Sequence, residues 1–149
     1  MHLINSIMTD LICNGFILSD LTIPALLSFQ WNLTGGANLS LLNKDCVKTK
    51  AETAKLQESD IQEFLKEIPN WAISYKTAIP HLIREYQFSD FASALDFVNQ
   101  VGIESDKQDH HPKITLEWGL VSIEWWTHSI GGFHINDFIM AYRCDKINQ

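Results

Sequence analysis

The feature that most constrains the fold is a stretch in the last third of the chain where two alternating runs meet at a glycine. Residues 113–118 and 120–128 each alternate from one side chain to the next, and Gly119 separates them. Alternation with a period of two is typical of a strand, and two such runs joined by a tight turn predict an antiparallel hairpin. We therefore expect a hairpin whose tip lies near Trp118-Gly119.

A helix and a second hairpin are predicted before this one. The apolar residues of 59–68 recur at i, i+3, i+4 and i+7, Ser59 and Gln62 fit a capping box, and Pro69 ends the helix. Residues 71–75 and 82–88 alternate as strands. The short connection between these two strands predicts that they also pair in antiparallel fashion.

Two further helices follow the two hairpins. The first is capped by Ser89, carries Asp90 in its first turn, and fades between Gly102 and Gln108. The last helix follows the glycine pair at 131–132, with His134 at or just before its N-cap and an acidic first turn. The order is helix, two strands, helix, two strands, helix. This order predicts an α+β two-layer sandwich, in which a four-stranded antiparallel sheet carries helices on one face.

Composition narrows the function and the compartment. The chain has 149 residues, a net charge of −7 and no basic stripe, which argues against a nucleic-acid partner. Its three cysteines are widely spaced, which favours free thiols. The first Lys or Arg is Lys44, and no apolar run approaches membrane-spanning length. We expect a cytoplasmic protein without membrane association.

Two segments differ in character. Residues 1–40 contain no Lys or Arg and show no periodic pattern, so we assign them as an N-terminal extension of unknown role. They form a packed extension, a flexible tail, or sequence upstream of the true start, and the last two together are favoured. Residues 41–149 form the predicted domain, which opens with a polar, loop-like lead-in.

The hairpin register brings histidines from its two ends together. Residues that pair in an antiparallel hairpin have a constant sum of residue numbers. With the tip at the predicted position, His128 lies opposite Asp109 and Trp126 lies opposite His111. A register error of one or two residues still leaves His128 beside His110 or His111.

Three imidazoles in one place can transfer protons near neutral pH, because histidine titrates there. Asp106 lies four residues before His110, so the two share a helical face if the helix runs that far. Pro112 holds His111 in an extended conformation at the joint between loop and strand. The turn at residues 131–132 brings the start of the last helix, with Asp137 in its first turn, back to the end of the hairpin where the histidines lie. These residues form the candidate acid/base site.

Other interpretations of the same residues remain open. The three imidazoles and Asp137 could bind zinc, although they do not have the spacing of a known metal motif. Asp137 could simply stabilise the helix dipole, and a histidine at a strand end is usually a surface residue. We expect His2 and His81 to be solvated. Trp118, at the far tip of the hairpin, is expected to serve packing or an interface.

The spaced pattern of these residues resembles the signature of the pterin-4a-carbinolamine dehydratases. Further similarity lies in residues 68–71, 86–91 and 134–138, and the resemblance covers roughly residues 41 to 145. The pattern reads Asp106-x3-His110-His111-Pro112-x5-Trp118-x9-His128-x8-Asp137.

The resemblance implies an enzyme that dehydrates 4a-hydroxytetrahydropterins to quinonoid dihydropterin and so recycles the cofactor of aromatic amino acid hydroxylases. It implies no metal or organic cofactor. The active-site histidines of the family fall on His110, His111 and His128, and its acidic positions fall on Asp106 and Asp137. A homodimer or homotetramer is expected from the family and from the exposed edge strands of the sheet.

Within this resemblance we expect His110 and His128 to act as acid and base, with His111 holding the pterin or the leaving hydroxyl. Trp126 shares a strand face with His128 and could border the flat pterin or serve packing. The alternative function is a non-catalytic dimerisation or regulatory module, as animal members of the family also provide. Bacterial-type members often carry C-x-x-C in the lead-in, whereas here Thr49 follows Cys46 at that spacing.

Overall fold

The computed structural model describes residues 40–149, so the expectations for residues 1–39 lie outside the described residues. The assignment of two segments that meet near residue 40 therefore stays a prediction. The described chain contains, in order, α2 (Glu58–Glu67), β1 (Ala72–Ser74), β2 (His81–Gln87), α3 (Phe91–Gln108), β3 (Lys113–Glu117), β4 (Leu120–Trp125), a 3-10 helix η1 (His128–Ile130) and α4 (Ile135–Ile147).

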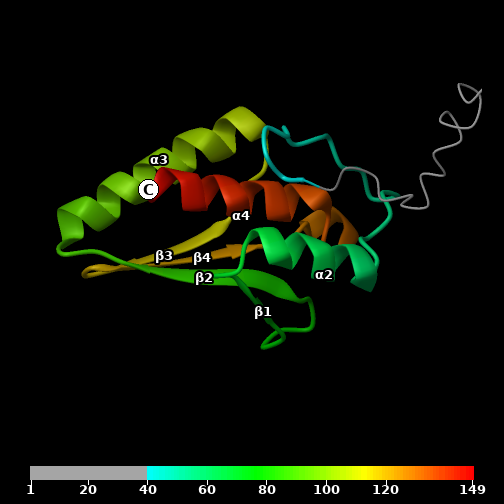
Figure 1. The fold of residues 1–149 in the computed structure, drawn as a ribbon, viewed down its shortest axis with the longest axis horizontal. Coiled ribbons are helices and arrows are strands. Elements are labelled where there is room, and N and C mark those ends of the chain that lie inside the picture. The colour runs from blue at the N-terminus through cyan, green and yellow to red at the C-terminus, as the bar shows by residue number, and fades with distance from the viewer. Residues whose placement is uncertain (1–39) are drawn as a thin grey trace, which may run out of the picture. The chain divides into compact units, whose positions relative to one another are not determined.

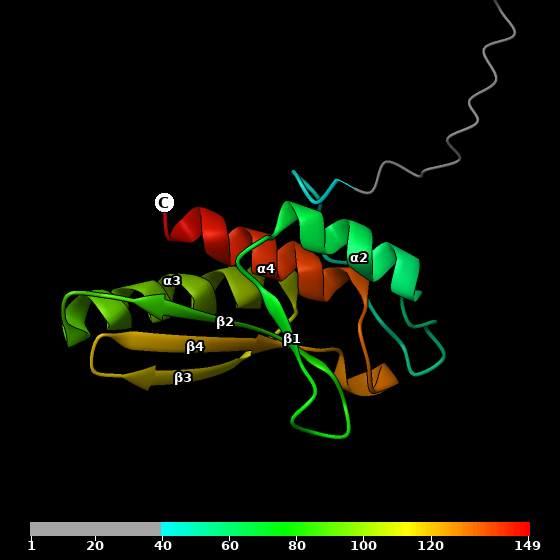
Figure 2. The same cartoon turned by 60° about the horizontal axis from the view of Figure 1, so that its bottom comes forward.

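The four strands form one antiparallel sheet in the order β1-β2-β4-β3, and α2, α3 and α4 all lie on one face of it (Figures 1 and 2). Lys113 pairs with Glu124 and Glu117 pairs with Leu120, which is the register predicted for a tip at residues 118–119. The β2 strand pairs with β4 and β1 pairs with β2, both antiparallel. The predicted α+β architecture is confirmed.

The core lies between the sheet and the three helices. In β4 the alternating residues Val121, Ile123 and Trp125 face the helices and are fully buried. The rings of Phe64 in α2 and Phe138 in α4 pack with centroids 5.3 Å apart. Burial of one face of each strand and one stripe of each helix is what the two periodicities in the sequence specify.

Two helix starts differ from the prediction. The N-cap of α2 is Gln57 and makes no side-chain cap bond, so the capping box expected at Ser59 is wrong. The amide of the preceding Leu56 donates to the Phe133 carbonyl, which fixes the chain just before the helix begins. The helix α3 is capped by the Asp90 carboxylate and not by Ser89.

The Asp90 carboxylate accepts the Ser93 amide at 2.8 Å, and the Ser89 hydroxyl donates to its second oxygen. These hydrogen bonds lower the pKa of Asp90. A charged cap also interacts with the positive end of the helix dipole, which explains why the aspartate takes the cap in place of the serine beside it.

The strand β4 ends at Trp125, three residues before the predicted end. Beyond it the Thr127 amide donates to the Gly132 carbonyl at 2.9 Å, and the Gly131 amide donates back to Thr127. Gly131 adopts a φ of 60°, a left-handed conformation that favours glycine. This closed turn replaces the end of the ladder, so His128 lies in η1 and not opposite Asp109.

No helix among residues 40–149 is long and apolar enough to cross a membrane.

Candidate active site

The three predicted histidines line one cleft. It has a volume of about 350 Å³ and lies where the end of α3, the start of β3, the end of β4 and η1 meet. Predicted site residues that line it include Pro112 and Trp126. Asp137 and Asp106 do not line it, but each binds one of its histidines, Asp137 from the buried side and Asp106 from the solvent side. The lining residues are Thr49, Asp109, His110, His111, Pro112, Trp126, Thr127, His128 and Ser129.

A left-handed residue sends the two adjacent histidines in different directions. The α3 helix ends at Gln108, and Asp109 follows with a φ of 50° and ψ of 39°. The His110 amide then donates to the Ser105 carbonyl at 3.2 Å, which closes the helix end. As a result the His110 side chain is buried, whereas that of His111 is exposed.

His110 is held by a buried carboxylate. Its Nε2 lies 2.7 Å from Oδ1 of Asp137, whose side chain is 0% exposed. The other oxygen of Asp137 accepts the Thr127 hydroxyl at 3.0 Å and the His134 amide at 2.8 Å. A carboxylate with these donors acts as an acceptor toward the imidazole, so Nε2 carries the hydrogen. Nδ1 of His110 is therefore the ring nitrogen left for a substrate.

Asp137 has both of the roles that the sequence suggested for it. One oxygen completes the capping box of α4 with His134, and the other fixes the ring of His110. His134 is the N-cap, as predicted, and its Nδ1 accepts the Asn136 amide at 3.3 Å. Partial burial lowers the pKa of His134, which keeps the ring neutral and able to accept.

The pairing expected between Asp106 and His110 is wrong. Asp106 instead binds His111, with 3.0 Å between Oδ1 and Nε2, and both side chains are largely exposed. The i, i+4 argument assumed that the helix continues through residue 110, but it ends at Gln108. Beyond that end the ring of His110 turns away, and the next histidine comes within reach of the Asp106 carboxylate.

His128 and Trp126 form the aromatic side of the cleft. Their ring centroids lie 4.4 Å apart at an interplanar angle of 52°. The Trp126 indole also stacks on the ring of His81, with centroids 3.8 Å apart and an interplanar angle of 10°. Within residues 40–149 the His128 ring makes no hydrogen bond, so both of its nitrogens face solvent or a ligand.

The expectation that His81 is solvated is wrong. Its side chain is 10% exposed, and Nδ1 lies 2.7 Å from Oε2 of Glu124. Partial burial would raise the pKa of Glu124, but hydrogen bonds from His81 and Lys113 outweigh it and lower that pKa. His81 is the first residue of the strand β2. The next residue, Leu82, pairs with Trp125 at the end of β4, and the ring of Trp126, one residue beyond that end, stacks on the His81 ring.

Sequence reasoning missed four residues of the cleft, Thr49, Asp109, Thr127 and Ser129. Thr127 shares a strand face with the buried Trp125, and that alternation could have indicated its inward direction. Ser129 and Thr49 carry no such signal, because their places depend on the turn at η1 and on the lead-in segment. Among the described residues no group of three or more His, Cys, Asp or Glu side chains could hold a metal ion, so the zinc interpretation gains no support there.

Comparison with known proteins identifies the family. The family model for pterin 4 alpha carbinolamine dehydratase matches residues 54–147. A Chlorobaculum tepidum protein named for this activity is 41% identical over 107 residues, which cover 72% of this chain and 96% of the relative. A relative from Chlorobium luteolum with the same name is 42% identical over 109 residues, again 72% of this chain and 96% of the relative.

A solved structure is also similar. It is a transcriptional coactivator/pterin dehydratase from Brucella melitensis, 28% identical, with a TM-score of 0.60 over 64% of this chain and 100% of that chain. The family match and the fold match agree with the motif on residues 106–137 and with the histidine-lined cleft. The predicted family and the predicted enzyme class, a dehydratase, are confirmed: the chain belongs to the pterin-4-alpha-carbinolamine dehydratase family.

Proposed function

We propose that this protein dehydrates 4a-hydroxytetrahydropterins to quinonoid dihydropterin and water by acid/base catalysis from its histidines. The observation that carries the proposal is the buried pair of His110 and Asp137, which presents one imidazole nitrogen of fixed direction to the cleft. The names of the relatives supply the substrate class. The cleft supplies groups suited to that reaction.

The reaction needs one acid and one base. The bond between the carbinolamine carbon and its hydroxyl oxygen breaks, and the oxygen takes a proton and leaves as water. The lone pair of the neighbouring ring nitrogen forms the carbon–nitrogen double bond, and that nitrogen loses its proton. One proton is delivered and one is removed, so no oxidant or reductant is required. Each positioned group contributes about 10²- to 10⁴-fold.

The geometry favours different roles for the three histidines. His110 is the base, because Asp137 fixes its tautomer and can stabilise the imidazolium that forms. His128, which faces the open side of the cleft, delivers the proton to the departing hydroxyl. His111, held loosely by Asp106, contacts the pterin or the hydroxyl. The Trp126 indole lines the same space and would contact the pterin beside the rings of His81 and His128, which already pack against it.

The test is a direct dehydration assay. A pterin-dependent hydroxylase generates the carbinolamine, and its disappearance is followed with the wild-type protein, His110→Ala and His128→Ala. The proposal predicts a clear acceleration by the wild type over the spontaneous reaction and a loss of that acceleration in both variants. Equal rates with all three proteins would refute histidine catalysis. Circular dichroism spectra of the variants establish that the fold is retained.

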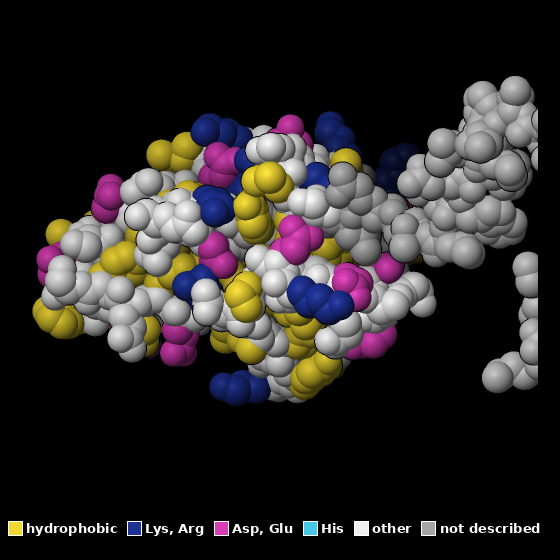
Figure 3. Space-filling view, viewed as in Figure 1, with side chains coloured by type: hydrophobic (Ala, Val, Ile, Leu, Met, Phe, Trp, Pro, Cys, Tyr) yellow, Lys and Arg dark blue, Asp and Glu magenta, His cyan; other side chains and the backbone are white. Residues whose placement is uncertain are grey.

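A second candidate function is a binding module, and the surface of α3 favours it. Figure 3 shows hydrophobic side chains at the surface in the region of α3, and Phe91, Leu95 and Ile103 are among the large exposed ones. The same surface would serve self-association into a homodimer or homotetramer. The Brucella relative carries both names, coactivator and dehydratase. Sedimentation of the wild type and of Leu95→Glu tests this surface, because an interface there predicts a smaller species for the variant.

Cofactor recycling for an aromatic amino acid hydroxylase and a cytoplasmic location both stay predictions. The recycling role is supported by the family alone. It is tested by adding the protein to a hydroxylase reaction in which free tetrahydropterin is limiting. A recycling enzyme raises the sustained hydroxylation rate, and a protein that only binds the hydroxylase leaves the rate of carbinolamine loss unchanged.

A further inference from the structure

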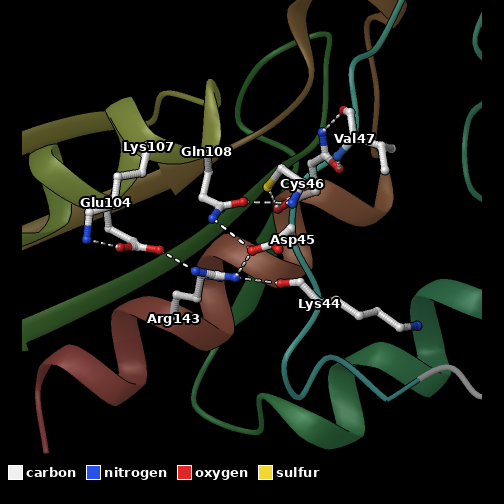
Figure 4. Close-up of polar contacts among 9 residues, drawn as sticks. Lys44, Asp45, Cys46, Val47, Glu104, Lys107, Gln108 and Arg143 are labelled. Carbon is white, nitrogen blue, oxygen red and sulfur yellow. Dashed lines mark hydrogen bonds and ion pairs between the residues drawn. The ribbon is translucent and has the colours of Figure 1, made fainter.

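We propose that residues 44–49, here named the strap, form a wall of the histidine cleft and position the substrate within it. The inference rests on the proposed function and adds residues that neither the sequence motif nor the acid/base chemistry includes. The strap lies across the ends of α3 and α4 and is held there by side chains of both helices (Figure 4). It belongs to the lead-in segment and contains no helix or strand.

Side chains from the two helices bind the backbone of the strap. Oε1 of Gln108 accepts the Cys46 amide at 2.8 Å. The amide group of Asn136 accepts the Val47 N–H at 3.1 Å and donates to the Val47 carbonyl at 2.7 Å. Nη2 of Arg143 donates to the Lys44 carbonyl at 2.7 Å. Partners in sequence-distant helices satisfy these backbone groups, so the docked position of the strap is specified and not accidental.

A charged cluster adds to this clamp. Arg143 binds the carboxylates of Glu104 and Asp45, the second at 2.7 Å, and its side chain is 25% exposed. Gln108 donates to the same Asp45 oxygen atom at 3.0 Å. Thus α3 contributes Glu104 and Gln108, α4 contributes Arg143, and the strap contributes Asp45 (Figure 4). Glu104 is 17% exposed and Asp45 is 78% exposed, so the bond of Arg143 to Glu104 is the stronger, charge-assisted one and its bond to Asp45 is screened by solvent.

Two of the residues that hold the strap are neighbours in sequence of the catalytic pair. Asn136 is 2% exposed and immediately precedes Asp137, and Gln108 lies two residues before His110. The first turn of α4 and the last residue of α3 therefore help to position both the strap and the pair formed by His110 and Asp137. Any displacement of these helix ends would move the strap and the ring of His110 together, which couples the wall of the cleft to its catalytic centre.

Thr49 is the residue at which the strap reaches the substrate space. It is half-buried and lines the cleft together with His110, His111 and His128. It also lines a second cavity of about 350 Å³, which lies beside the strap and is bordered by Cys46 and Asn136. Burial raises the pKa of the Cys46 thiol to about 12, so the thiol stays protonated and adds no charge to the wall.

This arrangement predicts an effect on substrate binding more than on proton transfer. Loosening the strap removes the Thr49 side of the cleft but leaves the bonds of His110 to Asp137 in place. Loss of one charge-assisted hydrogen bond in the clamp is expected to raise KM about tenfold, with kcat within about twofold of wild type. A purely structural role would lower stability without this split between KM and kcat.

The experiment compares Arg143→Met and Gln108→Ala with the matched control Arg84→Met. Arg84 also binds a carboxylate on α4, that of Asp145, and its side chain is 18% exposed. It lies away from the cleft, so its loss should lower stability and leave KM unchanged. Hydrogen exchange at the Cys46 and Val47 amides supplies a second measurement that does not depend on activity. The probe for that measurement is 7,8-dihydrobiopterin, a stable pterin.

We expect a raised KM in both strap variants, an unchanged KM in Arg84→Met, and slower exchange of the two strap amides when 7,8-dihydrobiopterin is added to the wild type. If the wild type dehydrates the carbinolamine but both strap variants keep its KM, the inference is wrong and the proposed function stands. Unchanged exchange at the Cys46 and Val47 amides with bound pterin would overturn it in the same way. A wild type without dehydration activity would overturn the proposed function and the inference with it.

Discussion

Two histidine–aspartate pairs lie at the same cleft and differ in almost every physical respect. In one, the side chains of His110 and Asp137 are 10% and 0% exposed, and the carboxylate has two further donors. In the other, His111 and Asp106 are 59% and 83% exposed, and their bond is 3.0 Å long. The motif in the sequence contains both pairs without distinguishing them.

The difference shows which pair can be preorganised. A buried carboxylate with fixed partners holds an imidazole in one tautomer and one orientation, without the entropic cost of ordering it during the reaction. An exposed pair is screened by water and salt and contributes at most about 1 kcal/mol. We therefore propose that the buried pair carries out the demanding proton transfer and that the exposed pair only contacts the substrate.

The largest expected effect is on stability, and it should distinguish Asp137 from Asp106 when each is replaced by alanine. Asp137→Ala leaves the His110 ring, the Thr127 hydroxyl and the His134 amide without their buried acceptor. This should cost about 3 to 5 kcal/mol of unfolding free energy, whereas Asp106→Ala should change it by less than about 0.5 kcal/mol. Urea unfolding at pH 7 measures both values. Similar losses in the two variants would remove the distinction between the pairs.

The next effect concerns the two adjacent rings in catalysis. His110→Ala should reduce dehydration by about 10²- to 10⁴-fold, because it removes the oriented base. His111→Ala should reduce it by less than about tenfold, because a contact to substrate of roughly 1 kcal/mol is lost. Single-turnover rates with freshly generated carbinolamine give the comparison. A larger loss for His111→Ala would reverse the assignment of roles.

A pH-dependent effect should arise at the cap that adjoins the buried pair. Burial lowers the pKa of His134 in the folded state from its ordinary value of 6.5. The unfolded chain therefore binds a proton more readily, so the stability from the neutral cap is complete above about pH 6.5 and is lost as pH falls below it. The urea concentration at the midpoint of unfolding should fall further between pH 7.5 and pH 5.5 in the wild type than in His134→Asn. Asparagine caps well without titrating, so equal falls would contradict this account.

The smallest effect is expected from the exposed carboxylate. Asp106→Asn removes the charge but not the shape, and should lower the dehydration rate by less than about fivefold. Added salt should shrink the difference from wild type further, because exposed charges are screened over about 10 Å at 0.1 M. Rates at low and high ionic strength test both statements. A salt-independent loss would indicate that Asp106 acts inside the cleft.

The fold could be predicted because local periodicity determines it. The alternation on both sides of Gly119 predicted the register of β3 and β4, since pairing follows from the position of the tip alone. The helical spacing of Ile61, Phe64 and Ile68 predicted a buried face, and all three are buried. The order of elements then left few ways to cover one face of the sheet.

The details of the site could not be predicted, because they depend on how elements end. The left-handed turn at Asp109 decides that His110 points inward, and the bond from Thr127 to Gly132 ends β4 early and places His128 in a turn. The stacking of His81 on Trp126 depends on contact beyond the paired part of two strands. Each of these features depends on tertiary contacts near the end of a helix or strand, and a periodic sequence pattern cannot predict such contacts.

The most direct test of the central claim is the dehydration rate of Asp137→Asn at pH 7. Asparagine fits the same buried space and can still accept the His134 amide, but it no longer supplies a carboxylate to fix the tautomer of His110. We predict a folded protein whose rate is at least about 10² times lower than that of wild type. A folded Asp137→Asn variant that dehydrates the carbinolamine within about twofold of the wild-type rate would contradict the account, because catalysis would then not depend on the buried pair.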